Sequence, residues 1–144
     1  MGKKRPYISY QELEKYIGKE NMIRFYEIMK DIFESYDFEK KEKKIKIYFL
    51  DYTTYLKYDE RFYYNKDVPE TYYYLCELEQ ILDSDLFSDT LEKFRGTRLS
   101  VSYTHVRNML ACNEVDKLGD IKDVAQKYGI TVTNLYKIRK RYKN

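Results

Sequence analysis

The stretch from residue 121 to residue 141, IKDVAQKYGITVTNLYKIRKR, constrains the fold more than any other part of the chain. Gly129 stands where a tight turn needs a positive φ, which glycine adopts without steric cost. Ala125, four residues earlier, is small enough to let a second helix approach closely, and Thr131 can cap that helix through its hydroxyl. Apolar residues at offsets that hold two short helices at a steep angle are Val124, Tyr128, Ile130, Leu135 and Ile138. The pattern predicts a helix-turn-helix.

The second helix of this motif has the composition of a DNA-facing surface. A helix in the major groove reads base edges with a few polar side chains, while Lys and Arg neutralise phosphates. Arg139 and Arg141 suit phosphate contacts or a pair with an acidic region. The residues predicted to bind DNA are Thr131, Thr133, Asn134, Tyr136, Lys137, Arg139, Lys140 and Arg141. The alternative interpretation is an ordinary helical hairpin with a basic end.

Charge is distributed unevenly along the chain. From Arg95 to Asn144 there are eleven Lys and Arg against four Asp and Glu, whereas from Ile45 to Phe94 there are five against eleven. A basic end beside an acidic middle is expected of a chain whose one end meets a polyanion. The acidic middle is also rich in Tyr, a residue that suits packing and protein interfaces and can stack on nucleobases. We favour packing and an interface for it.

Several classes of site are absent from the sequence. Cys76 and Cys112 form no CxxC pair, and with the single His105 they are too few for a zinc site. No nucleophile and base surround His105, and acidic pairs such as Asp83 and Asp85 suit helix caps. We therefore predict no catalytic residue, no metal site, no cofactor and no enzyme activity. The chain has neither a signal-peptide pattern nor an apolar run of membrane-spanning length, so we expect a cytoplasmic protein without membrane contact.

Periodicity along the rest of the chain predicts mostly helices. Ser9 and Glu12 form a capping box that opens a short helix before Gly18. The further expected elements are a helix over 20–36, a solvated charge run over 39–44, a strand over 44–52, helices over 69–82 and 86–94 (the second capped by Asp83), a strand over 97–103, and a helix capped by Thr104 and running to Val115. Residues 53–65 fit either a second strand or a Tyr-rich loop.

The helix predicted over 20–36 carries an apolar stripe that is too wide for one neighbouring element. Such a stripe indicates either a core or a seam between two copies of the chain. We predict a homodimer, with these side chains at its interface: Met22, Tyr26, Met29 and Phe33.

Four parts follow one another in the C-terminal half. They are the helix over 86–94, the sequence Gly96-Thr97-Arg98-Leu99 that opens a strand, the helix over 107–115 and the helix-turn-helix. From about Leu75 to Arg141 this order resembles the Mor family of phage transcription activators, named for a middle-operon regulator. Arg95 stands where that family usually has a second glycine. The resemblance implies a dimer formed through N-terminal helices, a two-fold DNA operator and a contact with RNA polymerase.

We expect a mainly α fold with a small β component, in which a C-terminal helix-turn-helix bundle is attached to an N-terminal α+β, Tyr-rich region. Residues 1–82 would form the dimerisation or interaction region, and residues 83–144 the Mor-like strand and DNA-binding domain. The expected function is that of a dimeric, sequence-specific regulator of transcription, of phage or mobile-element type, bound to double-stranded DNA. The alternative is a phage or mobile-element protein that inhibits or recruits a host protein through its acidic Tyr-rich region, with the helix-turn-helix auxiliary.

Overall fold

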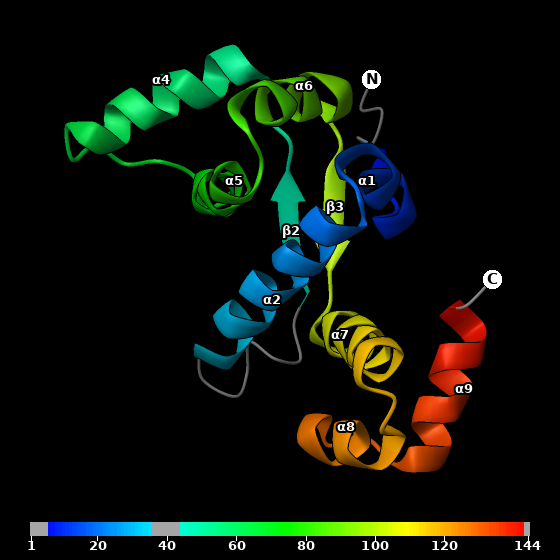
Figure 1. Cartoon of the computed structure of the whole chain (residues 1–144). Helices are drawn as coiled ribbons and strands as arrows, with labels where there is room; N and C mark the ends of the chain where they lie inside the picture. The colour runs from blue at the N-terminus through cyan, green and yellow to red at the C-terminus, as the bar shows by residue number, and fades with distance from the viewer. Residues whose placement is uncertain (1–5, 36–43, 143–144) are drawn as a thin grey trace. The chain divides into compact units, whose positions relative to one another are not determined.

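The structure is a computed structural model, and it describes residues 6–35 and 44–142 (Figure 1). These residues form eight helices and one three-stranded sheet, which confirms the expected mainly α fold with a small β component. The chain divides into two compact units: Met1–Phe25 with Lys44–Val101, and Tyr26–Lys43 with Ser102–Asn144. This division differs from the expected one at residue 82, because residues 84–101 pack with the N-terminal elements. Residues 39–43 of the expected charge run lie outside the described residues.

The sheet of the first unit consists of β1 (Tyr7–Ile8), β2 (Ile45–Tyr48) and β3 (Arg98–Val101), in the order β1-β3-β2. β1 pairs with β3 in parallel and β2 pairs with β3 antiparallel, so Leu99 lies opposite both Ile8 and Ile47. Leu99 and Val101 are buried and alternate with half-buried polar residues, which confirms the alternation predicted for this strand. β2 is shorter than the strand predicted over 44–52, because Asp51 begins a helix.

The helices of the first unit are α1 (Tyr10–Ile17), the start of α2 (Lys19–Ser35), α4 (Tyr52–Tyr63), α5 (Glu70–Ile81) and α6 (Ser84–Phe94). The capping box of α1 is present, since the Ser9 hydroxyl accepts from the Glu12 N–H and the Glu12 carboxylate accepts from the Ser9 N–H. Asp83 caps α6 as predicted, by accepting from the N–H of Leu86 at 2.8 Å. Both helix starts were therefore visible in the sequence.

Residues 53–65, expected to form a strand or a loop, instead lie largely within helix α4. The Asp51 side chain caps this helix by accepting a hydrogen bond from the N–H of Thr54 at 2.6 Å. Tyr55 is fully buried, and its ring centroid lies 5.0 Å from that of Phe87 and 5.5 Å from that of Tyr72. The cap and this packing outweigh the strand preference of Tyr and Thr.

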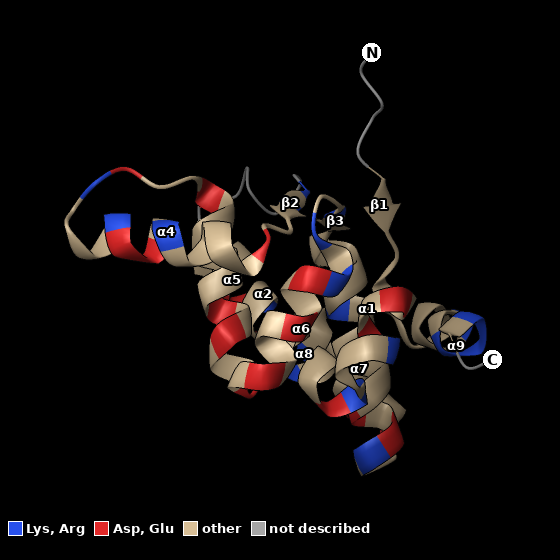
Figure 2. Ribbon diagram, turned by 90° about the horizontal axis from the view of Figure 1, so that it is seen from above, with Lys and Arg blue, Asp and Glu red and all other residues tan. Residues whose placement is uncertain are grey.

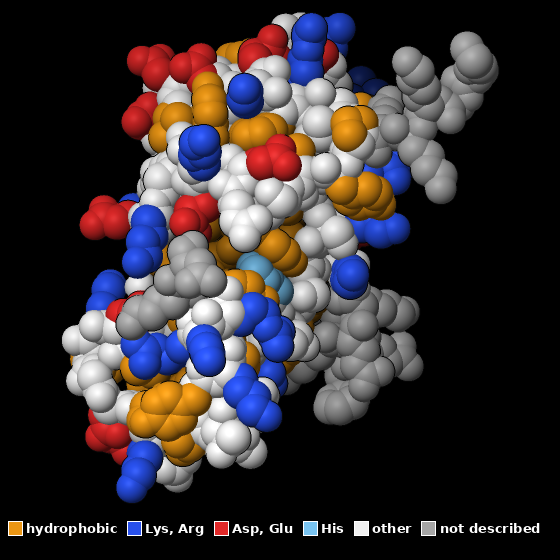
Figure 3. All heavy atoms as spheres, turned by 90° about the vertical axis from the view of Figure 1, so that its right-hand side faces the viewer, with side chains coloured by type: hydrophobic (Ala, Val, Ile, Leu, Met, Phe, Trp, Pro, Cys, Tyr) orange, Lys and Arg blue, Asp and Glu red, His pale blue; other side chains and the backbone are white. Residues whose placement is uncertain are grey.

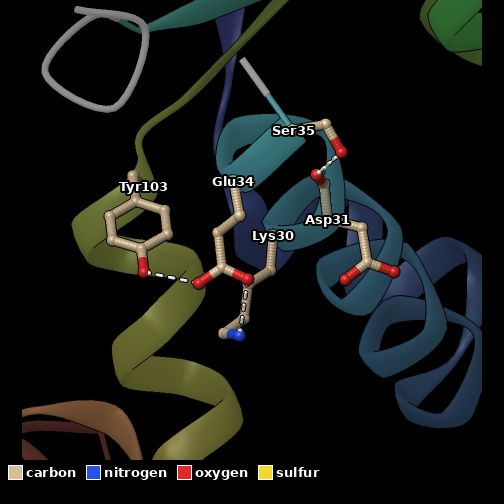
Figure 4. Close-up of polar contacts among 5 residues, drawn as sticks. All are labelled: Lys30, Asp31, Glu34, Ser35 and Tyr103. Carbon is tan, nitrogen blue, oxygen red and sulfur yellow. Dashed lines mark hydrogen bonds and ion pairs between the residues drawn. The ribbon is translucent and has the colours of Figure 1, made fainter. Parts of the chain in front are cut away.

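The second unit contains the end of α2 together with α7 (Tyr103–Leu118), α8 (Ile121–Tyr128) and α9 (Val132–Tyr142). Ser102 caps α7 by accepting from the N–H of His105, so the helix begins before the predicted cap Thr104. Figure 4 shows how α2 and α7 are joined at the surface. The Tyr103 hydroxyl donates to Glu34 Oε2 at 2.9 Å, and Lys30 Nζ pairs with Glu34 Oε1 at 2.9 Å.

The four residues predicted at a dimer interface form part of the core instead. Met22, Tyr26, Met29 and Phe33 of α2 are buried within the single chain. The ring of Tyr26 packs edge-on against His105, and the ring of Phe33 packs edge-on against Tyr103. The wide apolar stripe of this helix is therefore explained by packing within one chain, without a second copy.

Candidate nucleic-acid interface

The turn between α8 and α9 has the predicted conformation. Asp120 caps α8 by accepting from the backbone N–H groups of Lys122 and Asp123. Gly129 ends the helix with a φ of +66°, and the N–H of Ile130 donates back to the Ala125 carbonyl at 2.9 Å. A Cβ atom at Gly129 would meet no atom within 4 Å. The left-handed backbone conformation alone therefore favours glycine here.

One apolar cluster holds the three C-terminal helices together. Its members are buried and come from α7, α8, α9 and the intervening turn: Ala111, Cys112, Val115, Val124, Ala125, Ile130, Leu135 and Ile138. Ala125 is almost fully buried within this cluster, as expected for a residue at which two helices approach closely. Among the predicted core residues of the motif, Tyr128 is the one that stays half-buried. This core holds α9 at a defined angle to α8.

The outward side of α9 carries most of the residues predicted to bind DNA. Thr131 caps this helix, since its Oγ1 accepts from the N–H of Asn134 at 3.1 Å. Leu135 and Ile138 are buried, and side chains three or four residues apart share a helix side, so Thr133 and Lys137 project opposite them. The exposed residues of the predicted set are Thr131, Thr133, Asn134, Tyr136, Lys137, Lys140 and Arg141. Of these, we call Thr133, Tyr136, Lys137, Lys140 and Arg141 the basic face.

The basic face contains no opposing charge. Helix α9 has four Lys and Arg residues and no Asp or Glu. Figure 2 marks the Lys and Arg segments of α9 in blue, and Figure 3 shows basic side chains gathered over this part of the second unit. A cluster of exposed cations on one helix attracts anions such as phosphate groups.

Arg139 lies away from the basic face. Its Nη2 atom pairs with Asp116 Oδ1 of α7 at 2.6 Å, and its side chain is 21% exposed. Its Nε atom is buried and has no acceptor among the described residues. The sequence allowed either a phosphate contact or a pair with an acidic region. The structure places Arg139 in a pair with Asp116, within the same unit, where it anchors α9 to α7.

His105 has a structural environment. Burial lowers the pKa of His105 from 6.5 to about 4, so its ring is neutral at physiological pH. Its Nε2 atom lies 3.2 Å from the Tyr26 hydroxyl, and the Tyr142 ring centroid lies 5.7 Å from its own. The side chain joins α2, α7 and α9 within the second unit, and no pattern in the sequence predicts these contacts.

Within residues 6–35 and 44–142, no three His, Cys, Asp or Glu side chains lie close enough together to hold a metal ion. Cys76 and Cys112 are both free thiols. None of the described helices combines the length and apolar character needed to cross a membrane.

Comparisons with models of protein families, with curated proteins and with solved structures find no match to this chain. The resemblance to the Mor family therefore stays a prediction that rests on the order of sequence elements.

Proposed function

We propose that the chain is a sequence-specific regulator of transcription that inserts α9 into the major groove of DNA. The observation that carries this proposal is the basic face of α9, which is exposed and free of acidic residues on a helix held by a buried three-helix core. A helix with its side chains is about 10–12 Å across, which matches a groove about 12 Å wide. The helix α9 therefore suits the major groove both in its width and in the positive charge of its exposed side.

The residues of the basic face divide into two roles. Thr133 and Tyr136 carry hydroxyl groups that donate and accept hydrogen bonds, so they read base edges. Lys137, Lys140 and Arg141 neutralise phosphates and set the register of the helix on the duplex. Thr131 and Asn134 lie at the first turn of α9, where side chains and backbone N–H groups contact phosphates.

A single α9 covers only a few base pairs, so we propose that two chains bind an inverted repeat. Half-sites for such a pair are spaced by about one helical turn of DNA, 10–10.5 base pairs. Because Met22, Tyr26, Met29 and Phe33 are buried within one chain, contacts between the two copies use other surfaces. Selection from a random DNA library tests this point, since an inverted repeat is expected among the recovered sites.

The proposal is tested by measuring DNA affinity at several salt concentrations. Lys137→Ala combined with Lys140→Ala should lower the slope of log affinity against log salt by about 1.8, because each phosphate contact contributes roughly 0.9. The matched control is Lys57→Ala combined with Lys66→Ala, which removes the same charge from exposed positions of the first unit. If the control and the test variant lower the slope equally, α9 does not contact DNA.

Discrimination between sites provides a second measurement. Thr133→Ala should reduce the difference in binding free energy between specific and random DNA by about 1–3 kcal/mol, the range for a lost base contact. The salt slope should stay unchanged in this variant, because no phosphate contact is lost. A uniform loss for all duplexes would instead assign Thr133 to the phosphate backbone.

A further inference from the structure

The first unit exposes a group of aromatic side chains where α4 ends and α5 begins. We call Phe62, Tyr63, Tyr64 and Tyr73 the aromatic face, and their exposed fractions are 49%, 78%, 63% and 48%. The ring centroids of Phe62 and Tyr73 lie 5.8 Å apart, and those of Tyr63 and Tyr64 lie 5.1 Å apart. Scattered exposed aromatic residues are common, but clustered ones mark surfaces that bind a partner.

Two members of the aromatic face, Phe62 and Tyr73, are held by ordered structure beneath them. Phe62 and Tyr73 both pack against the ring of Tyr72, which is buried and stacked on Tyr55. The chain after α4 is closed by hydrogen bonds from the Asn65 N–H to the Phe62 carbonyl and from the Lys66 N–H to the Arg61 carbonyl. A surface fixed in this way loses little conformational entropy when it binds.

Carboxylates are interleaved with these rings. Glu70 and Glu77 lie three residues before and four residues after Tyr73, so they share its side of α5. Asp59 and Glu60 lie four and three residues before Tyr63, so they share its side of α4. Figure 2 shows the Asp and Glu segments of α4 and α5 in red.

The balance of charge around the aromatic face is negative. Across residues 56–77, which carry the aromatic face, five Asp and Glu stand against three Lys and Arg. The basic residues of this segment are Lys57, Arg61 and Lys66, and Arg61 Nε donates to the backbone carbonyl of Asp67 at 3.1 Å. The segment that carries the rings therefore has a net negative charge.

We propose that the aromatic face docks an arginine-bearing, basic segment of another protein. A guanidinium group stacks on Tyr and Phe rings and also pairs with carboxylates, so it uses both features of this surface. Nucleic acid fits less well, because carboxylates repel phosphates. A symmetric pair of copies fits less well too, since the same patch would face itself and bring carboxylates together.

The test measures binding of two labelled peptides to the full chain. One peptide alternates four Arg with Gly, and the other replaces each Arg with Lys. We expect the wild type to bind the Arg peptide about fivefold more tightly, because guanidinium stacks on aromatic rings better than ammonium does. Tyr63→Ser combined with Tyr64→Ser should remove this preference. Asp85→Asn combined with Asp89→Asn is the control, since it removes two exposed carboxylates of α6 and keeps every ring of the aromatic face.

Circular dichroism confirms that each variant is folded, and Tyr73→Ser alone replaces the double variant if that chain does not fold. Equal affinity of the two peptides for the wild type would overturn the proposal, since binding would then follow charge alone. A wild-type dimer that dissociates in the Tyr63 and Tyr64 variant would assign the surface to a second copy. Binding of an oligothymidylate that this variant loses would assign it to single-stranded nucleic acid. Either result would overturn the proposal for the aromatic face, and neither would affect the separate proposal that α9 binds DNA.

Discussion

Arg139→Ala separates the residues that hold α9 in place from those proposed to contact DNA. Arg139 and Lys140 are neighbours in sequence and carry the same charge, yet Arg139 pairs with Asp116 and Lys140 is exposed. We expect Arg139→Ala to lower stability and to leave the salt dependence of DNA binding unchanged. Lys140→Ala should leave stability unchanged and should reduce the salt dependence of DNA binding.

The size of the stability loss expected for Arg139→Ala follows from the geometry of the pair between Arg139 and Asp116. A charge-assisted hydrogen bond of 2.6 Å is short, but the two side chains are 21% and 40% exposed, so solvent screens it. We therefore assign the pair about 1 kcal/mol, near the upper end for partly exposed ion pairs. The aliphatic stem of Arg139 adds packing, while its buried Nε without an acceptor subtracts from the total. The net loss expected for Arg139→Ala is about 1 kcal/mol, or roughly 3 °C in melting temperature for a chain of this size.

Urea unfolding followed by circular dichroism measures the stability term, and a double-mutant cycle with Asp116→Ala isolates the pair. The expected coupling energy is about 0.5–1 kcal/mol. DNA affinity at several salt concentrations is then measured for both single variants, with a slope change of about 0.9 expected for Lys140→Ala only. Unchanged unfolding of Arg139→Ala, together with a slope reduced as in Lys140→Ala, would refute this reasoning and assign Arg139 to phosphate.

Three further outcomes are expected. Gly129→Val should destabilise the second unit by about 1–2 kcal/mol in urea unfolding, whereas Gly129→Asn should cost less, because Asn tolerates the left-handed φ of +66° that Gly129 adopts. Met29→Asp should unfold the chain, because Met29 is fully buried and a carboxylate there has no partner. The control Glu27→Ala, at an exposed position of the same helix, should stay folded. If Met29→Asp instead gives a folded monomer, Met29 lies at an interface between two copies. The free energy of unfolding should fall by about 2 kcal/mol as pH falls from 6.5 to 4, because His105 protonates near its ordinary pKa of 6.5 in the unfolded chain and only near a pKa of about 4 in the folded chain. His105→Gln should remove that part of the pH dependence.

The parts of the fold that were predicted correctly depend on local chemistry. Ser9, Asp83 and Thr131 cap the helices for which they were proposed, because a cap needs only a side chain within three residues of a free N–H. Gly129 was recognisable for the same reason, since its φ is set by the turn in which it lies. The exposed side of α9 then follows from the positions of Leu135 and Ile138.

The parts that were missed depend on contacts between distant residues. Helix α4 could not be told from a strand because its Tyr and Thr residues favour strands, and its burial of Tyr55 depends on Tyr72 and Phe87. The two-residue strand β1 pairs with β3, about ninety residues later, and carries no periodicity of its own. The partner of Arg139 was missed as well, since Asp116 lies on another helix.

The second compact unit is assembled from two separate stretches of chain, Tyr26–Lys43 and Ser102–Asn144. Its helix-turn-helix therefore cannot be moved to another protein by a single genetic exchange before Ser102. Such an exchange would carry α7, α8 and α9 but would leave behind Tyr26 and Phe33, which pack against His105 and Tyr103. A transferred segment would begin with an exposed apolar side on α7, and it would need a new helix from its host to cover that side. Recombination between related genes should thus preserve α2 and α7 together, although some seventy residues separate them in sequence.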